Sequence, residues 1–256
     1  MADLEVFQFP TRGDNYGVLI HDPATEATAS IDAPDAEQIL AALHEMGWTL
    51  THILVTHHHH DHTAGNEVLR RMTGCTIIGP EAEARSIPGI DIQVKEGDII
   101  EIGDAQATVI ETPGHTRGHV SYYFPDDKLV FVGDTLFSLG CGKLLEGDAK
   151  TMWHSLVKLA LLPPDTSLYC GHEYTANNAR FALTIEPENA ALQARAKDVA
   201  RRTELGQPSL PSSIEQELET NPFLRASSPA IQQRLGMEGR EPWEIFGEIR
   251  KRKDRF

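Results

Sequence analysis

The amino-acid sequence predicts an α/β domain followed by a helical C-terminal domain. Three observations support this fold class. Short apolar strands alternate with amphipathic helices near the N-terminus. Four apolar strands are each followed, just past the C-terminal end, by histidine or aspartate. Beyond about residue 170 helical patterns replace the strands, so we expect one domain over residues 1–170 and a second over residues 171–256.

The N-terminal elements are expected in the order strand, strand, strand, helix, strand, helix, strand. Pro34 should open the first helix, in the position that proline prefers, and Gly47 should end it. Apolar side chains recur along that helix with helical spacing and give it one core-facing stripe. The expected strands cover residues 6–9, 16–20, 28–32, 53–56 and 75–78, and the helices cover residues 34–47 and 66–72.

The composition excludes several classes of protein. The 256 residues carry a formal net charge of -15, with 40% hydrophobic and 24% charged residues. This is typical of a globular protein, and the acidic balance argues against a nucleic-acid partner, which needs a basic surface. We find no signal-peptide core and no apolar run of membrane-spanning length. Three cysteines favour a reducing compartment over a disulfide framework, so we expect a cytoplasmic location. We further expect no membrane partner and, without a sequence pattern that derives it, a monomer.

The segment Thr56–His62 contains the pattern H-x-H-x-D-H, in which His57, His59, Asp61 and His62 take the defined positions. Imidazoles and a carboxylate at this density are a metal-binding signature. An apolar strand precedes the segment, which should therefore lie on a turn at the C-terminal end of that strand. There His57 and His59 should face one metal, and Asp61 with His62 a second. The alternative is a purification tag, but a tag would lie at a terminus and would not follow a buried strand in the sequence.

Three later strands repeat this construction. Residues 107–111 lead to His115, residues 129–132 to Asp134, and residues 167–170 to His172. A lone histidine is usually structural, but loops at the C-terminal ends of strands in a layered α/β fold gather at one edge, where sites form. The recurrence therefore predicts that these residues join the histidine-rich segment as metal ligands. His119 is expected to be a packed or supporting histidine, and the three cysteines to be small packed residues.

The C-terminal part is predicted to be helical, with no strand after His172. Either Ser212 or Ser213 can cap one of its helices. The basic tail Arg250–Arg255 is either a solvated helix end or a cationic patch that holds an anion. The expected helices cover residues 151–160, 174–185, 188–204 and a last segment around residues 243–249.

These residues resemble the metallo-β-lactamase superfamily over about residues 1–170. The matching residues are His57-x-His59-x-Asp61-His62, His115, Asp134 and His172. Within the superfamily, the chain more closely resembles the hydroxyacylglutathione hydrolase family, also called glyoxalase II. The motifs that carry this closer resemblance are Gly133–Phe137, Gly140–Lys143, Gly171–Tyr174, Asn221–Arg225 and Arg250-x-x-Lys253-Asp254.

The resemblance implies an αββα sandwich with a helical C-terminal domain. It also implies two divalent metal ions per chain, zinc before iron or manganese, although histidine and aspartate suit all three. The implied activity is hydrolysis of S-D-lactoylglutathione and other S-2-hydroxyacylglutathiones to glutathione and D-lactate, the second step of methylglyoxal detoxification. In the implied ligand set one ion is held by His57, His59 and His115, and the other by Asp61, His62 and His172, with Asp134 bridging.

The implied chemistry is attack by a metal-bridging hydroxide on the thioester carbonyl. Zn²⁺ can lower the pKa of water from about 15.7 to about 7, so hydroxide is available at neutral pH. A metal ion also stabilises the tetrahedral oxyanion, and a thiolate whose thiol pKa is about 8.5 leaves with little help from a general acid. Asp61 and Asp134 are the expected catalytic residues, and we hypothesise that Asp61 also orients the hydroxide.

The resemblance further implies that Lys143, Tyr174, Arg250 and Lys253 contact the glutathione part of the substrate. Glutathione conjugates carry two carboxylates and one ammonium, so an acidic protein needs a local cationic patch to bind them. Some family members have a tyrosine two residues after the lysine, where this chain has Leu145. That departure predicts weaker glutathione binding.

Other functions use a similar site. A metal-dependent nuclease of the superfamily is disfavoured by the net charge of -15. A persulfide dioxygenase would use one redox-active iron and would have less use for the basic tail. A non-catalytic zinc-stabilised module is disfavoured because the candidate ligands, shared by two ions, leave coordination positions open. A secreted lactamase would carry a signal peptide.

Overall fold

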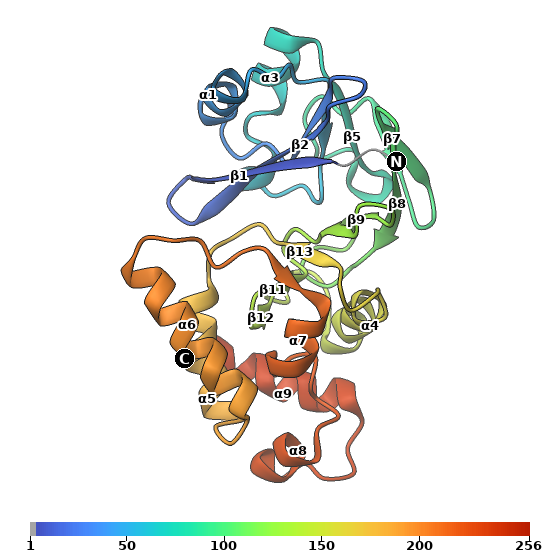
Figure 1. Ribbon diagram of the computed structural model, residues 1–256. Helices are drawn as coiled ribbons and strands as arrows, with labels where there is room; N and C mark the ends of the chain where they lie inside the picture. The colour runs from blue at the N-terminus through green and yellow to red at the C-terminus, as the bar shows by residue number, and fades with distance from the viewer. Residues whose placement is uncertain (1–3) are drawn as a thin grey trace. The chain divides into compact units, whose positions relative to one another are not determined.

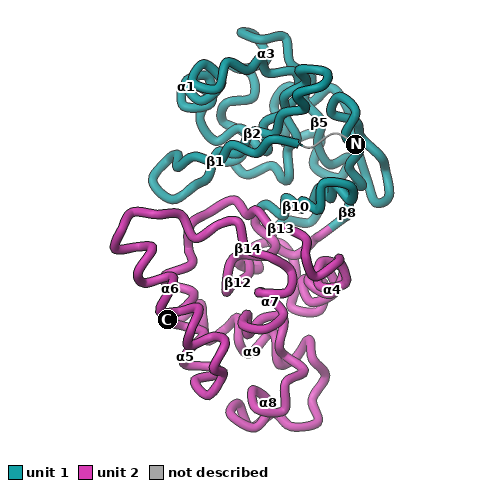
Figure 2. Tube along the Cα trace, in the orientation of Figure 1, with its two compact units in different colours: residues 1–111, 116–133 teal, residues 112–115, 134–256 magenta. Residues whose placement is uncertain are grey.

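A computed structural model describes residues 4–256 and divides the chain into two compact units (Figure 1, Figure 2). Unit 1 comprises residues 1–111 and 116–133, and unit 2 comprises residues 112–115 and 134–256. The predicted boundary near residue 170 cuts the chain once along its sequence. The two units are defined by spatial contacts, and each contains segments that are separate in the sequence. That boundary therefore stays a prediction.

Unit 1 contains a six-stranded mixed sheet in the order β1-β2-β3-β4-β5-β6. The first three strands are antiparallel neighbours, and β3 to β6 run parallel. The parallel part follows from the strand-helix-strand rhythm of the sequence, because parallel neighbours need a crossover connection. The strands are β1 Glu5–Thr11, β2 Asn15–Asp22, β3 Ala27–Ile31, β4 His52–Leu54, β5 Thr76–Pro80 and β6 Ile92–Val94.

Helices α1 Ala36–Met46 and α3 Asn66–Thr73 pack on one face of this sheet and bury an apolar core there. Asp35 caps α1, because its carboxylate accepts a backbone N–H from the first turn, and Gly47 ends the helix in the left-handed conformation. The expectation that Pro34 opens the helix is wrong by two residues, since the Asp35 cap sets the first helical residue at Ala36.

A second, antiparallel sheet in unit 1 contains the strands β10, β9, β8 and β7 in that spatial order. Tyr122 of β9 is fully buried, and its hydroxyl donates to the Val55 carbonyl after β4 at 2.7 Å, which ties this sheet to the first. The strands are β7 Ile99–Ile102, β8 Ala105–Glu111, β9 Val120–Phe124 and β10 Leu129–Phe131.

The histidine-rich segment departs in part from the predicted turn. Its second half forms the short helix α2 His60–Thr63, in which the His62 N–H donates to the His59 carbonyl and the Ala64 N–H to the His60 carbonyl. This single helical turn therefore carries both Asp61 and His62. A 3₁₀ turn, Glu81–Glu83, is the other short helical element in the described part of unit 1.

Unit 2 is mainly helical. Helices α5 and α6 pack together and bury their apolar side chains in a small core that includes Leu139, Ala182 and Leu192. Among the described residues, no helix is both long enough and apolar enough to cross a membrane. The helices are α4 Ala149–Ala160, α5 Thr175–Ile185, α6 Ala190–Glu204, α7 Ile214–Thr220, α8 Pro229–Leu235 and α9 Pro242–Asp254.

Two short antiparallel strand pairs complete unit 2. Strands β11 Leu136–Phe137 and β12 Gly140–Cys141 form a hairpin, and β13 Ser167–Tyr169 pairs with β14 Ser212–Ser213. The last strand corrects the expectation that no strand follows His172, and its two residues are too few to leave a periodic pattern. Of the two possible caps, Ser213 caps α7.

Candidate active site

In unit 1 the four predicted ligands of the histidine-rich segment lie close together. His57 Nε2 and His59 Nδ1 are 3.0 Å apart, and His62 Nε2 lies 3.6 Å from a carboxylate oxygen of Asp61. Tetrahedral ligands with metal bonds of about 2.0–2.2 Å lie roughly 3.3–3.6 Å from one another. The separation between Asp61 and His62 lies at the upper end of this range and that between His57 and His59 slightly below it, so the donors stand near the spacing of ligands that share metal ions.

Asp32 orients two of these histidines. Its carboxylate accepts hydrogen bonds from the Thr56 N–H and hydroxyl, at 2.7 and 2.9 Å, and from His62 Nδ1 at 2.7 Å. Because the Thr56 proton goes to Asp32, the Thr56 oxygen accepts from His57 Nδ1 at 3.0 Å. Each imidazole then carries its lone pair on Nε2, which is the form that binds a metal ion.

Glu83 holds a second part of the segment. One carboxylate oxygen accepts from the His58 N–H and from His58 Nδ1, at 2.7 and 2.8 Å, and the other accepts from the Gly118 N–H at 2.8 Å. His119, the next residue, packs its buried ring on His57 with 5.0 Å between centroids. The prediction of a packed or supporting histidine at this position is confirmed.

Sequence reasoning missed Asp32 and Glu83. Asp32 closes the strand predicted at residues 28–32, and an acid at a strand end was the signal that identified Asp134. The same signal could have found Asp32. No pattern in the sequence distinguishes Glu83 from an exposed glutamate, although it is buried.

In unit 2 the predicted ligands His115, Asp134 and His172 converge, and all three are buried. The Asp134 Oδ2 atom lies 3.4 Å from His115 Nε2 and 3.4 Å from His172 Nε2. His115 Nδ1 donates to the Lys143 carbonyl at 2.9 Å, so Nε2 carries the lone pair. A carboxylate oxygen between two imidazoles, beyond the usual hydrogen-bond distance, fits a bridging ligand.

Two glycines allow the backbone around Asp134 to pack closely. Gly133 has a φ of +45°, and a Cβ there would lie 2.5 Å from the Thr56 hydroxyl oxygen and 2.7 Å from His119 Nε2. At Gly142 a Cβ would lie 1.9 Å from the Asp134 carbonyl oxygen. Neither position can accept a larger residue without moving its neighbours.

The four predicted substrate contacts line one cavity of unit 2, whose volume is about 450 Å³. The Tyr174 ring stacks on His172 with 4.8 Å between centroids. Basic side chains, an aromatic ring and two predicted metal ligands therefore share one wall. The residues in question are Lys143, Tyr174, Arg250 and Lys253, together with His115 and Asp134.

Arg250 and Lys253 differ in their surroundings. Arg250 is only 4% exposed; its guanidinium pairs with Asp254 at 2.9 Å and donates to the Cys141 carbonyl at 2.9 Å. Lys253 is partly buried and donates to the Asn177 side chain. Burial, and to a lesser extent the nearby charge of Arg250, lowers the pKa of Lys253 to about 8. The charge of Lys253 therefore varies close to neutral pH.

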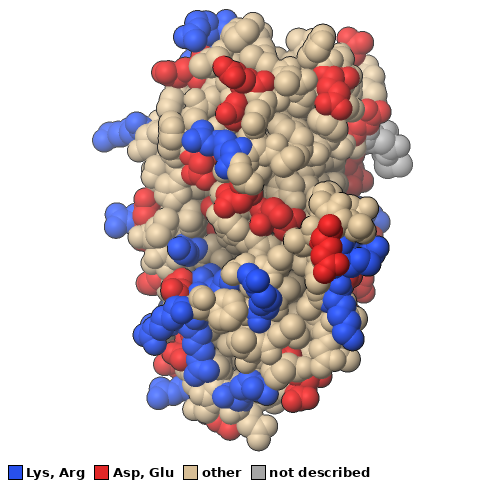
Figure 3. All heavy atoms as spheres, turned by 90° about the vertical axis from the view of Figure 1, so that its left-hand side faces the viewer, with Lys and Arg blue, Asp and Glu red and all other residues tan. Residues whose placement is uncertain are grey.

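Cationic residues are concentrated in unit 2. Sixteen of the 23 Lys and Arg residues of the chain belong to it. On the face drawn in Figure 3 their side chains gather over this unit. An anion near this unit therefore meets less repulsion than the net charge of the whole chain suggests.

Two protein families match this chain. The family described as the metallo-β-lactamase superfamily matches residues 12–172, and the hydroxyacylglutathione hydrolase C-terminus matches residues 173–256. A hydroxyacylglutathione hydrolase from Brucella ovis is 59% identical over 253 residues, which cover 99% of this chain and 98% of that protein.

Solved structures show the same architecture. ETHE1 from Myxococcus xanthus is 27% identical, with a TM-score of 0.67 over 97% of this chain and 98% of that one. The BLEG-1 B3 metallo-β-lactamase is 22% identical, with a TM-score of 0.66 over 86% of this chain and 99% of that one.

The matched family, together with the mixed sheet and the antiparallel sheet of unit 1, defines a metallo-β-lactamase fold with a helical C-terminal region, which confirms the predicted fold class. Membership of that superfamily, with clusters of His and Asp in both units, supports binding of divalent metal ions. Within the superfamily, the chain belongs to the hydroxyacylglutathione hydrolase family.

Proposed function

We propose that this protein hydrolyses S-D-lactoylglutathione and other S-2-hydroxyacylglutathiones to glutathione and the free 2-hydroxy acid. The observation that carries the proposal is the cavity of unit 2, where His115 and Asp134 share a wall with Lys143 and Lys253. Metal-competent groups and cations for an anionic thiol ester are thus found in one space. The relatives that are 59% identical are described as hydroxyacylglutathione hydrolases and support the same activity.

We assign the ligands of two divalent ions as the sequence predicted. Zinc is the metal that we expect, with iron and manganese as alternatives. The separations of 3.4 Å around Asp134 and 3.6 Å between Asp61 and His62 support this assignment. When bound, the ions would polarise the thioester carbonyl and lower the pKa of water. The first ion would be held by His57, His59 and His115 and the second by Asp61, His62 and His172, with Asp134 shared.

Asp61 is the acid that we expect to orient the attacking water. Its side chain is 40% exposed, whereas that of Asp134 is 9% exposed, so Asp61 is the carboxylate that solvent reaches more easily. Asn15 Nδ2 donates to the Asp61 carboxylate at 3.2 Å and limits its rotation. The carboxylate can then accept a hydrogen bond from the water. This hydrogen bond directs a lone pair of the water oxygen at the carbonyl carbon.

The basic residues of the cavity would bind the tripeptide. Lys143 and Lys253 suit its carboxylates, and the Tyr174 hydroxyl can donate a further hydrogen bond. Arg250 already pairs with Asp254. Contact between Arg250 and a substrate carboxylate would therefore need this ion pair to be exchanged, because a buried guanidinium has few donors to spare.

Metal analysis combined with a substrate panel tests the proposal. Purified protein should contain two divalent ions per chain and cleave S-D-lactoylglutathione faster than a thioester without glutathione, a β-lactam or a phosphodiester. Preferential cleavage of the phosphodiester would reject the proposal in favour of a nuclease. Oxygen consumption with a glutathione persulfide would favour a dioxygenase.

We also propose that the protein is a cytoplasmic monomer. All three cysteines, Cys75, Cys141 and Cys170, are free and buried, which suits a reducing compartment. Size-exclusion chromatography with light scattering should give a mass near 28.3 kDa. A mass twice as large would reject the monomer.

A further inference from the structure

The hairpin of β11 and β12 connects two parts of the proposed site within unit 2. It begins two residues after Asp134 and ends two residues before Lys143. Phe137 and Cys141, one from each strand, line the cavity. The Phe137 ring also contacts the Tyr174 ring, with 5.2 Å between centroids. The shape of this hairpin therefore sets where Asp134 and Lys143 stand with respect to each other.

The hairpin has little stability of its own. Its strands pair at two positions, Leu136 with Cys141 and Phe137 with Gly140. Leu139 in the turn has a φ of +58°, in the left-handed region that a leucine rarely adopts. An isolated two-stranded hairpin is marginal at best in water. Groups outside the hairpin must therefore hold its turn.

Glu217 and Asn221 supply that support. Glu217 is fully buried, and its Oε2 atom accepts the Leu139 N–H at 2.9 Å. Asn221 Nδ2 donates to the carbonyls of Phe137 and Gly140, at 3.2 and 2.9 Å, and to Glu217 Oε2 at 2.9 Å. Two side chains thus hold three backbone groups of the hairpin. These hydrogen bonds also indicate a role for Asn221, the first residue of the sequence motif Asn221–Arg225.

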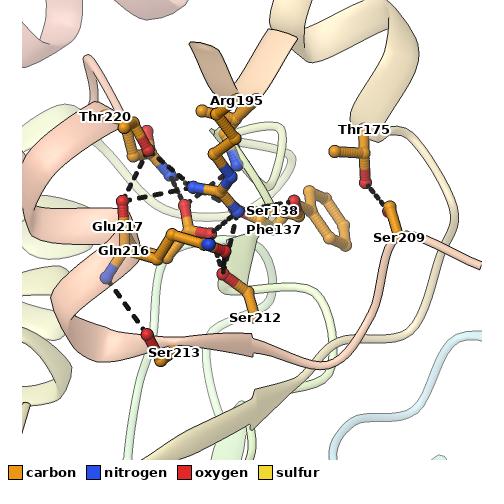
Figure 4. Close-up of polar contacts among 12 residues, drawn as sticks. Phe137, Ser138, Thr175, Arg195, Ser209, Ser212, Ser213, Gln216, Glu217 and Thr220 are labelled. Atoms are coloured by element: carbon orange, nitrogen blue, oxygen red, sulfur yellow. Dashed lines mark hydrogen bonds and ion pairs between the residues drawn. The ribbon is translucent and has the colours of Figure 1, made fainter. Parts of the chain in front are cut away.

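Arg195 completes the cluster, and Figure 4 shows its guanidinium between Ser138, Ser212, Glu217 and Thr220. One nitrogen, Nη2, lies 2.5 Å from Glu217 Oε1 and donates to the hydroxyl of Ser138 in the hairpin at 3.0 Å. Nη1 donates to the Thr220 hydroxyl at 2.6 Å. A buried carboxylate needs such a partner, because an unpaired buried charge is costly.

We propose that Glu217, with Arg195 and Asn221, is a positioning residue for the reaction. Glu217 is neither a predicted ligand nor a residue of the cavity wall. It acts through the hairpin, which it fixes so that Asp134 and Lys143 stand at the spacing that a glutathione thioester needs. This inference rests on the proposed function.

Two variants, Glu217→Gln and Asn221→Ala, test the proposal. Each should raise the KM for S-D-lactoylglutathione about tenfold, the low end of what loss of a supporting group costs, while the metal content stays at two ions. A small thioester without the tripeptide should be affected less. Hydrogen exchange at residues 136–143 should become faster in the same variants, because the Leu139 N–H loses its acceptor or its turn loses support.

Glu186→Gln is the matched control. Glu186 is a buried glutamate of unit 2 that pairs with Arg225 at 2.7 Å, and none of its hydrogen bonds goes to the hairpin. This variant should lower the melting temperature without changing the KM or the exchange at residues 136–143. A merely structural role of Glu217 would give the same result as this control.

The outcomes separate the two proposals. If Glu217→Gln does not fold, Asn221→Ala decides, because it leaves the ion pair of Glu217 and Arg195 intact. Faster exchange with an unchanged KM, or an equal rise of KM in Glu186→Gln, would overturn the positioning role. If the unaltered protein cleaves no glutathione thioester, the proposed function fails, whereas the exchange data still show whether Glu217 holds the hairpin.

Discussion

The buried carboxylates that lie outside the predicted ligand set and support the site have different partners in the two units. In unit 1, Asp32 and Glu83 accept hydrogen bonds from histidines and backbone N–H groups. In unit 2, Glu217 pairs with Arg195. A histidine that binds a metal must keep a lone pair, and a carboxylate at its other nitrogen selects that tautomer. An arginine in the same place would compete for the carboxylate and repel the ion. Glu217 can pair with Arg195 because it supports a hairpin rather than a histidine.

The units also differ in charge. Unit 1 has 7 of the 23 Lys and Arg residues and 21 of the 38 Asp and Glu residues, whereas unit 2 has 16 and 17. The net charge of -15 is therefore almost entirely that of unit 1. The mean charge of the chain argues against a broad nucleic-acid surface, but it does not reveal that the cavity lined by Lys143, Arg250 and Lys253 lies in the nearly neutral unit.

The largest effect is expected from Asp134→Asn. The amide keeps the shape of the side chain but removes the anionic oxygen that lies 3.4 Å from both His115 and His172. Turnover of S-D-lactoylglutathione should fall about 10³-fold, with fewer than two ions per chain by elemental analysis. Asp165→Asn, at an exposed position of the same unit, is the control. Full activity with both ions in Asp134→Asn would contradict the shared-ligand role.

Asp32→Asn tests whether carboxylates in unit 1 serve the histidines. Without the charge at His62 Nδ1, metal affinity should fall about 10–100-fold in a competition against a chelator. The exposed Glu37→Gln serves for comparison and should bind metal as the parent does. If Asp32→Asn binds metal equally tightly, the contrast between the units loses its functional meaning.

A pH profile tests the cationic cavity of unit 2. Burial lowers the pKa of Lys253 to about 8, so the ammonium is present below that pH and is lost above it. The KM for an anionic glutathione thioester should therefore rise as the pH rises through 8, by up to about tenfold between pH 7 and 9. Lys253→Arg keeps its charge over this range, and its KM should change little. If the KM of Lys253→Arg changed with pH in the same way as that of the parent protein, Lys253 would be excluded as the titrating group.

The smallest effect is expected from Leu145→Tyr. Leu145 is 59% exposed and lies two residues after Lys143. A tyrosine there can add one hydrogen bond to the tripeptide, which should lower the KM about two- to tenfold and leave kcat unchanged. Leu161→Tyr, at a position that is 80% exposed, is the matched control. Equal kinetics in both variants would show that residue 145 does not face the substrate.

Local patterns predicted much of the fold because strands, helices and their ends leave signals within a few residues. Strand β2, helix α5 and helix α9 fall where the periodicity placed them. The histidine-rich segment could be identified because four candidate ligands, three histidines and one aspartate, lie within six residues of the sequence. Asp32 carries the same strand-end signal as Asp134, but its partners 24 and 30 positions away are not visible in the sequence. Glu83 carries no such signal and contacts the segment from 25 positions away.

The tail shows a second limit of sequence reasoning. Its charges suggested a solvated helix end or an anion site, yet Arg250 is buried over the Phe223 ring at 5.2 Å and paired with Asp254. A charge pattern gives no information on which aromatic ring, 27 positions earlier, will cover the guanidinium. Likewise, β11, β12 and β14 have two residues each, too few for any periodicity to appear.

The buried cysteines have a consequence for how the protein withstands electrophiles. Burial raises the pKa of Cys75 and Cys170, and raises that of Cys141 to about 11. Aldehydes, alkylating agents and peroxides attack the thiolate form, which these side chains hardly populate near neutral pH. Covalent modification at sulfur is therefore disfavoured at all three positions, and at Cys141 even though it lies in the cavity wall.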